Sequence, residues 1–200
     1  MNAEESIPLT PSVLLMAYRR GIFPMANEKG KIGWYDADPR AILPLGDSFH
    51  IPRSVARTIR RGRFEIRVDT AFRDVMEACA QPTPRRGKAW ISREIIEAYS
   101  ELHSLGFAHS VEAWLDGELV GGLYGVSLGG LFAGESMFSR APGASKVALV
   151  HLTHHLRRGG FVLHDTQMMT PVVRSFGASM ISRDEYQRRL AEALRAPAIF

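Results

Sequence analysis

The sequence predicts an α+β protein in which a small N-terminal α/β domain precedes a larger mixed domain. Three features of the 200 residues lead to this prediction: a first quarter rich in turns, a central run of extended segments, and helical segments on both sides of that run. The extended segments are joined at Asp116-Gly117 and Gly129-Gly130, two-residue sequences that are typical of β-hairpin turns. We therefore expect three antiparallel strands in succession.

The N-terminal region contains one predicted helix, over residues 10–20. Its apolar residues Val13, Leu14 and Tyr18 follow helical spacing, and a Thr-Pro pair suits its first turn. Glycine or proline occupies seven positions between Gly21 and Gly46, so the rest of this region is expected to form short strands and loops. We expect the first domain at residues 1–52 and the second at residues 53–200.

The second domain is predicted to mix helices and strands, with helices near both of its ends. The helices are expected at residues 52–61, 70–80, 92–105, 143–158 and 183–195, and the strands at 64–68, 109–115, 118–128, 131–139, 161–165 and 178–182. Ser92 suits a helix N-cap, whereas Gly106 and the pair Gly159-Gly160 suit helix ends. A short helix is expected between the last two strands.

The predicted order of these elements is typical of one kind of fold. A helix, three antiparallel strands, a second helix and a further strand follow one another, as in N-acyltransferases of the acetyltransferase (GNAT) type. Fold order by itself identifies no substrate.

Arginine provides most of the positive charge. Lysine and arginine together number 25 against 21 acidic residues, which gives a net charge of +4. Five arginines gather in one short stretch: Arg53, Arg57, Arg60, Arg61 and Arg63. A guanidinium group binds phosphate through two parallel hydrogen bonds, so this stretch is a candidate surface for nucleic acid. A solvated helix face without a ligand is the alternative.

Several features predict a cytoplasmic protein without membrane association. No apolar run approaches the roughly 18 residues of a membrane-spanning helix, and the first residues lack the basic-then-apolar pattern of a signal peptide. The single cysteine, Cys79, cannot form an internal disulfide, which fits a reducing compartment. We also expect a monomer.

Nine short stretches together resemble the leucyl/phenylalanyl-tRNA–protein transferase family. They occur in the family's order over nearly the whole chain: AYRRGIFPM at 17–25, DPR at 38–40, WIS at 90–92, LHSLGFAHSVEAW at 102–114, LVGGLYGVSLG at 119–129, FAGESMFSR at 132–140, ASK at 144–146, DTQ at 165–167 and SFGA at 175–178. The GESMFS stretch and the HSVE…GGLYG pattern are specific, whereas ASK or DPR alone is not.

The resemblance implies an aminoacyltransferase. Members transfer Leu, Phe or, less readily, Met from aminoacyl-tRNA to the N-terminal α-amine of proteins that begin with Arg or Lys. The product is marked for degradation through the N-degron route. The resemblance also implies a small N-terminal domain, an acetyltransferase-like domain, and a reaction that uses neither acyl-CoA nor a metal.

By resemblance, Asp165 and Gln167 are the catalytic pair. Residues two apart on a strand project from the same face, and the amide oxygen of Gln167 can accept an amine N–H and orient its lone pair. Asp165 can polarise that amide or stabilise the positive charge that develops on nitrogen. The family's D-C-Q reads D-T-Q here, with Thr166 in the middle. The alternative is that both residues only cap the turn after the strand.

Glu135 is the candidate residue for binding the acceptor. It lies between Gly134 and Ser136, where glycine permits the close approach of another chain. Its carboxylate can pair with the guanidinium or ammonium group of the acceptor's first residue. The alternative is a structural salt bridge, for example to Arg140.

The donor side chain, Leu or Phe, needs a dry apolar pocket. By resemblance its lining residues are Leu123, Phe132, Met137, Leu149, Leu152, Leu156 and His164. The alternative is that all are ordinary core residues. His164 stands where the family usually has an aliphatic residue, and Leu152 and Leu156 stand where aromatic residues can occur.

Trp34 and Trp90 are candidates to stack on the terminal adenosine of the tRNA, because aromatic rings bind unpaired bases. The arginine stretch between Arg53 and Arg63 would then contact the tRNA backbone without reading its sequence. The alternative is two core tryptophans beside a solvated helix.

No metal site is predicted. His151, His154 and His155 lie on one predicted helix, but no carboxylate or cysteine stands beside them at ligand spacing.

Two other functions stay open at this point. An acetyl-CoA-dependent acetyltransferase would use the loop at 140–145, which matches half of a pyrophosphate-binding pattern but has Ser145 where the second glycine of that pattern would stand. A non-catalytic RNA-binding module would bind tRNA in a strongly salt-dependent way, without turnover. We favour the aminoacyltransferase.

Overall fold

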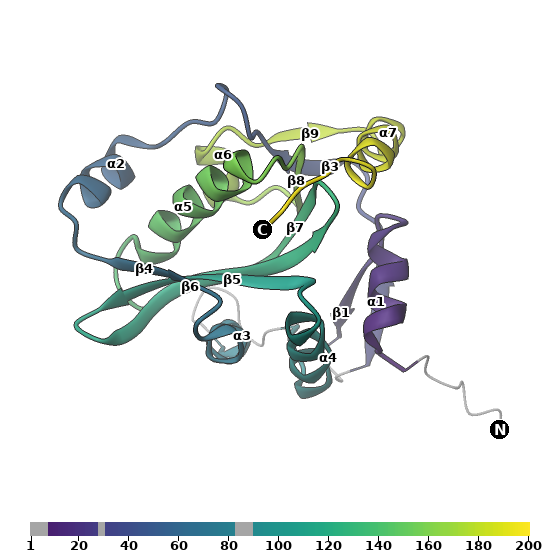
Figure 1. The fold of residues 1–200 in the computed structure, drawn as a ribbon, viewed down its shortest axis with the longest axis horizontal. Helices are drawn as coiled ribbons and strands as arrows, with labels where there is room; N and C mark the ends of the chain where they lie inside the picture. The colour runs from purple at the N-terminus through teal and green to yellow at the C-terminus, as the bar shows by residue number, and fades with distance from the viewer. Residues whose placement is uncertain (1–7, 28–30, 83–89) are drawn as a thin grey trace.

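The computed structural model describes residues 8–27, 31–82 and 90–200. Its strands form one seven-stranded sheet and one two-stranded sheet. Helices cover both faces of the larger sheet (Figure 1). The α+β class predicted from the sequence is confirmed.

The elements follow the predicted order closely. They are α1 (Pro11–Tyr18), β1 (Phe23–Ala26), β2 (Ile32–Tyr35), β3 (Arg40–Leu43), α2 (Arg53–Arg60), β4 (Glu65–Val68), α3 (Phe72–Ala80), α4 (Arg93–Ser104), β5 (Ala108–Leu115), β6 (Glu118–Leu128), β7 (Leu131–Ser139), α5 (Ala144–Arg158), β8 (Leu163–Gln167), α6 (Pro171–Ser175), β9 (Ser179–Ile181) and α7 (Arg183–Ala193). The meander β5–β7, followed by α5 and β8, is the acetyltransferase-like arrangement that the sequence predicts.

Two helices begin at the caps that the sequence indicates. The hydroxyl of Thr10 accepts a hydrogen bond from the backbone N–H of Val13 at 3.3 Å, and proline occupies the first turn of α1. The hydroxyl of Ser92 caps α4 in the same way, through Ile95 N–H at 3.3 Å. Among the described residues, no helix combines the length and the hydrophobicity needed to cross a membrane.

The large sheet has the strand order β4-β5-β6-β7-β8-β3-β9. β3 pairs antiparallel with β8 on one side and with β9 on the other. The three strands of the first quarter of the chain therefore do not form a sheet of their own. Of these three, β3 enters the large sheet, while β1 and β2 pair with each other. The domain boundary near residue 52 stays a prediction.

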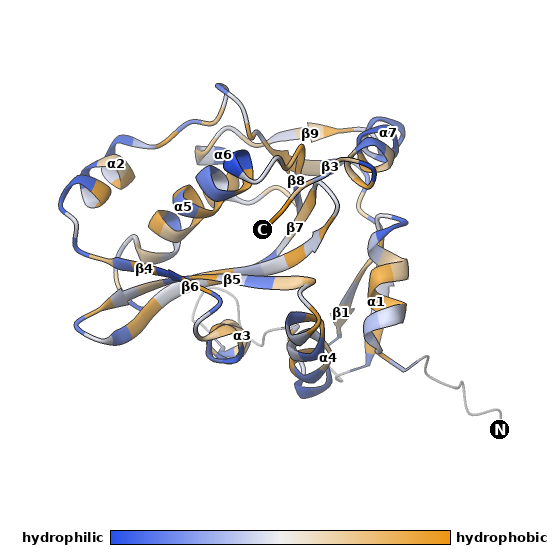
Figure 2. Cartoon of the chain, viewed as in Figure 1, coloured by the Kyte–Doolittle hydropathy of each residue, from blue (hydrophilic) through white to orange (hydrophobic). Residues whose placement is uncertain are grey.

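Each face of the large sheet carries its own apolar cluster. One cluster unites α1, α3 and α4 with residues such as Tyr124, Val126 and Ala133 of the sheet. The other unites α5 with Leu123 and Phe132 from the opposite face. Figure 2 shows hydrophobic residues along the central strands and hydrophilic residues on α7, which agrees with this burial.

The sheet opens between β7 and β8. These two strands pair in parallel only where Leu131–Ala133 meets Leu163–Asp165, and in the part of the chain that the structure describes they do not pair beyond this register. Each strand also carries a β-bulge on its other side. Tyr124 pairs with Ser136 and Gly125 with Gly134, so Glu135 is the extra residue of β7.

The second bulge lies between β3 and β8. Ala41 pairs with Gln167 and Ile42 pairs with Asp165, so Thr166 is the extra residue of β8. Bulges redirect side chains locally, and these two lie on either side of the opening. Irregular pairing therefore flanks the opening on both sides.

The glycine-rich stretch of β6 is a strand in close contact with α5. A Cβ atom added to Gly121 would collide with the Cβ of Ala144 and would lie 2.9 Å from the backbone nitrogen of Ser145. Glycine therefore lets the first turn of α5 rest directly on the sheet.

We expect Gly121→Ala to lower the free energy of unfolding by about 1–3 kcal/mol, because the added methyl group overpacks this contact. Gly46→Ala is the matched control, since nothing lies within 4 Å of a Cβ atom at that position. Urea denaturation of both variants measures the difference. Equal stability of the two variants would contradict the packing argument.

Candidate active site

The centre of the site is a buried ion pair between Arg40 on β3 and Asp165 on β8. Nε of Arg40 lies 3.0 Å from Oδ1 of Asp165, and Nη2 lies 2.7 Å from Oδ2, so the two groups meet through parallel hydrogen bonds. Both side chains are 1% exposed. The two residues are 125 positions apart in the chain and come together because β3 and β8 are neighbours.

Other groups complete the surroundings of this ion pair. The hydroxyl of Tyr186 donates to Oδ2 of Asp165 at 2.8 Å, and the backbone N–H of Gln167 donates to Oδ1 at 2.8 Å. Nη1 of Arg40 donates to the carbonyl oxygen of Gly21 at 2.9 Å. Burial, and then the neighbouring carboxylate, raises the pKa of the Tyr186 hydroxyl, so it stays protonated and acts as a donor.

Glu135, the extra residue of the β7 bulge, faces this ion pair across the opening. Its Oε1 accepts two hydrogen bonds of 2.7 Å, one from the hydroxyl of Tyr18 and one from Nε2 of Gln167. The Tyr18 hydroxyl lies 2.5 Å from the hydroxyl of Tyr99. A single chain of hydrogen bonds therefore runs from α4 through α1 and β7 to the end of β8.

Burial raises the pKa of Glu135 to about 7, against the opposing effect of its hydrogen bond from Tyr18. The negative charge of Asp165 raises this pKa further. Glu135 is thus a carboxyl group that changes its charge near neutral pH. Such a group can attract a cationic ligand when it is ionised.

The two predicted catalytic residues, Asp165 and Gln167, lie in the same network. The bulge at Thr166 interrupts the simple alternation that the sequence predicts, and Gln167 has a φ of +55°, which ends the strand. What connects the pair is the hydrogen bond from the backbone of Gln167 to Asp165. Because Nε2 donates to Glu135, the amide oxygen of Gln167 is left to accept from another group.

The predicted donor-pocket residues lie together on the α5 face of the sheet. Five of them belong to one buried cluster, namely Leu123, Phe132, Leu149, Leu152 and Leu156. Met137 packs against this cluster. His164 lies beside Phe132 in the β7–β8 register, with the two rings edge to face at 5.7 Å. The structure thus groups these residues next to the opening, and their role as a pocket stays a prediction.

The predicted tRNA-binding residues form two separate groups. Trp34 lies on β2 opposite Pro24 of β1, and the carbonyl of Trp90 accepts a hydrogen bond from Ala26, also of β1, at 3.1 Å. Both tryptophans are partly buried against the core. They therefore flank the same small strand, on the α1 and α4 side of the molecule.

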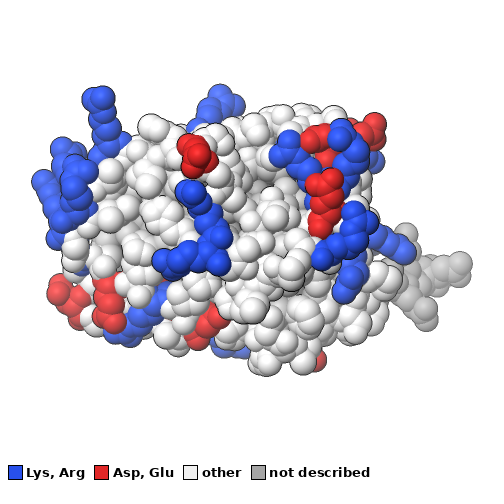
Figure 3. All heavy atoms as spheres, turned by 45° about the horizontal axis from the view of Figure 1, so that its top comes forward, with Lys and Arg blue, Asp and Glu red and all other residues white. Residues whose placement is uncertain are grey.

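The arginines lie on and just after α2, at the far end of the large sheet. All five are exposed: Arg53, Arg57, Arg60, Arg61 and Arg63. Within the described part of the chain, no carboxylate lies within salt-bridge distance of any of them, whereas Arg67 pairs with Glu65. Figure 3 shows Lys and Arg side chains gathered at this end of the molecule. Their charge is available to a ligand.

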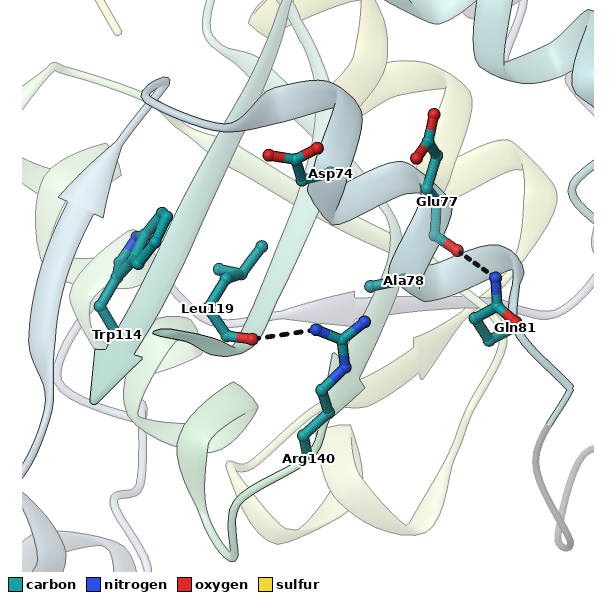
Figure 4. Close-up of a pocket in the computed structure, with 7 residues that line it drawn as sticks. All are labelled: Asp74, Glu77, Ala78, Gln81, Trp114, Leu119 and Arg140. Atoms are coloured by element: carbon teal, nitrogen blue, oxygen red, sulfur yellow. Dashed lines mark hydrogen bonds between the residues drawn. The ribbon is translucent and has the colours of Figure 1, made fainter. Parts of the chain in front are cut away.

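One alternative from the sequence, the salt bridge between Glu135 and Arg140, finds no support in the geometry. Arg140 donates to the carbonyl oxygen of Leu119 at 3.1 Å, so it does not serve as the salt-bridge partner proposed for Glu135 (Figure 4). That arginine lines a pocket with Asp74 and Trp114 that shares no residue with the hydrogen-bonded network. Among the described residues, no cluster of His, Cys, Asp and Glu could hold a metal ion.

Four residues of the network are missing from the predicted site: Tyr18, Arg40, Tyr99 and Tyr186. Two of them carry a signal in the sequence, since Tyr18 lies in the AYRRGIFPM stretch and Arg40 ends the DPR stretch. Arg40 is also a charged residue at the start of the apolar segment RAIL, where an unpaired charge would be costly. Tyr99 and Tyr186 follow helical spacing and resemble ordinary core residues.

Arg40→Met is expected to lower the free energy of unfolding by about 3–5 kcal/mol, because it leaves the Asp165 carboxylate buried without its counter-ion. Arg93→Met is the control: Arg93 pairs with Glu97 at 2.9 Å but is 88% exposed, so its loss should cost at most about 1 kcal/mol. Chemical denaturation of both variants tests this. Similar losses in the two would show that the buried pair is not a stabilising centre.

Comparison with known proteins identifies the family of the chain. Residues 42–191 match the family model described as leucyl/phenylalanyl-tRNA protein transferase, and residues 8–38 match the model of its N-terminal domain. A leucyl/phenylalanyl-tRNA–protein transferase of Herpetosiphon aurantiacus is 59% identical over 96% of this chain and 98% of that protein. A leucyl/phenylalanyl-tRNA–protein transferase of Paramagnetospirillum magneticum is 55% identical over 96% of this chain and 93% of that protein.

Among solved structures, a GCN5-related N-acetyltransferase-like protein from Streptococcus suis is 15% identical, with a TM-score of 0.37 over 86% of this chain and 64% of that chain. The family models together cover most of the sequence, and the two curated relatives match nearly all of it. The chain belongs to the leucyl/phenylalanyl-tRNA protein transferase family.

Proposed function

We propose that this protein transfers Leu, Phe or, less readily, Met from aminoacyl-tRNA to the N-terminal α-amine of proteins that begin with Arg or Lys. The observation that carries the proposal is the hydrogen-bonded pair Glu135–Gln167 at the opening between β7 and β8. It brings a carboxyl group and an amide together where β7 and β8 separate, on the two strands that also carry Phe132 and His164. The modified proteins would enter the N-degron route of degradation.

The reaction is the aminolysis of an ester. The lone pair of the neutral α-amine attacks the carbonyl carbon of the aminoacyl ester, and a tetrahedral intermediate forms. The bond between that carbon and the ribose oxygen of the tRNA then breaks, and the ribose oxygen takes up the proton lost by nitrogen. A free α-amine has a pKa of about 7.7–8.0, so much of it is already neutral near that pH. Correct placement of the amine is the main requirement.

Gln167 is suited to orient the attacking amine. Its amide oxygen can accept an N–H of the amine and direct the lone pair toward the ester. The side chain is held by its donor bond to Glu135, and its backbone is held by Asp165. Gln167 is thus the proposed catalytic residue in contact with the substrate.

Asp165 fits a positioning role. Its two oxygens accept from Arg40, from Tyr186 and from the backbone of Gln167. Because these contacts occupy both oxygens, Asp165 is better suited to hold Gln167 in position than to contact the substrate directly. The negative charge of Asp165 can still stabilise positive charge that develops on the amine nearby.

Glu135 is suited to bind the first side chain of the acceptor. Both of its described hydrogen bonds reach Oε1. Oε2 can therefore pair with a guanidinium or ammonium group of Arg or Lys, which would explain a basic acceptor.

The tRNA would contact both groups of residues described above. We propose that Trp34 and Trp90 stack on the unpaired 3′ end, and that the arginines of α2 contact phosphates of the acceptor stem. We further propose that the protein acts as a monomer in the cytoplasm, with no metal and no acyl-CoA.

The direct test incubates the protein with leucyl-tRNA and a peptide that begins with Arg, and follows the peptide by mass spectrometry. We expect the peptide to gain one leucine residue. Gln167→Ala should lower kcat about 10²-fold through misplacement of the amine, while the dissociation constant of the tRNA stays within about twofold. The exposed Gln81 supplies the control variant, Gln81→Ala. Acylation of the peptide from acetyl-CoA alone would refute the proposal.

A second prediction concerns pH. With a pKa of about 7, Glu135 would be ionised to about one tenth at pH 6 and to about nine tenths at pH 8. The ratio of kcat/KM between the wild type and Glu135→Gln, measured with the same Arg-initiated peptide, should therefore rise about tenfold over this range. The α-amine titrates equally with both enzymes and cancels in the ratio. A ratio that does not change with pH would exclude Glu135 from binding the acceptor.

A further inference from the structure

One buried polar group near the opening is not used by the proposed mechanism. His164 on β8 is 2% exposed and lies between Phe132 of β7 and Leu43 of β3 in the sheet register. Both neighbours belong to the apolar cluster on the α5 face. Of the seven predicted donor-pocket residues, His164 is the one with a strong hydrogen-bonding group.

One nitrogen of the His164 imidazole, the buried Nδ1, has no hydrogen-bond partner among the described residues. Burial lowers the pKa of His164 to about 4, so the ring is neutral at physiological pH and carries one N–H donor and one acceptor nitrogen. A buried polar atom without a partner destabilises a protein, and such atoms are rare unless they serve a ligand or hold water.

The other nitrogen of His164 lies beside the glycine that precedes Glu135. A Cβ atom added to Gly134 would stand 3.4 Å from Nε2 of His164. Gly134 follows Ala133, the last residue of β7 that pairs with β8. The ring is therefore close to the opening through which the proposed donor side chain would enter.

We infer that His164 makes the donor pocket accept an aromatic aminoacyl group that ends in a hydroxyl, namely tyrosine, in addition to leucine and phenylalanine. This inference rests on the proposed function. A phenol hydroxyl can donate to the acceptor nitrogen of the ring or accept from its N–H, so either tautomer provides a partner. The side chains of Leu and Phe offer neither.

The expected gain in affinity for a tyrosyl side chain comes from the state of the imidazole before that side chain binds. Its Nδ1 is already removed from water, so a hydroxyl that reaches the ring adds a hydrogen bond without further loss of hydration on the protein side. A site that binds a hydroxyl in this way distinguishes it from hydrogen more strongly than an apolar pocket distinguishes one methylene group. The thioether of Met accepts hydrogen bonds only weakly, so the same argument gives it little benefit.

The test uses one tRNA charged in turn with leucine, phenylalanine or tyrosine, and an Arg-initiated peptide as the acceptor. The wild type should transfer all three amino acids. In His164→Leu, the ratio of kcat/KM for tyrosine to that for phenylalanine should fall at least tenfold, while leucine is still transferred. His154→Leu, at an exposed position of α5, is the control and should leave the ratio unchanged.

The outcomes separate this inference from the proposed function. Transfer of leucine and phenylalanine without tyrosine overturns the inference and leaves the proposed function standing. A tyrosine-to-phenylalanine ratio that is equal in wild type and His164→Leu also overturns it. If no donor is transferred at all, both this inference and the proposed function are refuted.

A measurement on the wild type alone covers the case in which His164→Leu does not fold. Calorimetry compares two non-hydrolysable analogues, 3′-amide-linked tyrosyl-adenosine and phenylalanyl-adenosine. Tighter binding of the tyrosyl compound supports the inference. Equal or weaker binding of the tyrosyl compound means that the imidazole is satisfied by water alone, and this result refutes the inference.

Discussion

The buried ion pair between Arg40 and Asp165 is the interaction on which the site depends. A carboxylate with 1% exposure is stable only when charge and hydrogen bonds compensate it. Arg40 supplies the charge, and Tyr186 together with the backbone of Gln167 supplies the remaining donors. Because these groups come from β3, α7 and β8, the pair ties three separate parts of the chain to one point.

The position of Gln167 follows from this arrangement. Its backbone is bound to Asp165, and its side chain is bound to Glu135, which in turn is held by Tyr18. Each group in the series has its orientation determined by the next, so the amide at the opening is held before any substrate arrives. Such preorganisation suits a reaction that needs placement of its reactants more than a strong base.

The sequence predicts the local parts of this structure well. The turns at Asp116-Gly117 and Gly129-Gly130, and the caps at Thr10 and Ser92, depend on neighbouring residues, and the structure has each of them. The α+β class and the family follow from such elements and from the motifs. The grouping of the apolar residues around Phe132 was likewise accessible from the resemblance.

The nonlocal parts could not be predicted in this way. The strand β3 is four residues long, and its place between β8 and β9 depends on pairing partners more than a hundred positions away. The same distance separates Arg40 from Asp165. The unpartnered nitrogen of His164 and the bulge at Glu135 also require coordinates, because neither residue type nor spacing indicates them.

The bulge at Glu135 has a consequence for the rest of β7. Side chains alternate between the faces of a strand, and one extra residue exchanges the two faces for every residue that follows. Met137 consequently joins the cluster around Phe132, whereas Phe138 packs with the cluster on the α3 and α4 face. Removal of a single residue here would restore an ordinary ladder and would leave Met137 and Phe138 on the faces that they now occupy. The extra residue therefore adds a carboxyl group beside the separation of β7 and β8 without disturbing the packing on either side of the sheet.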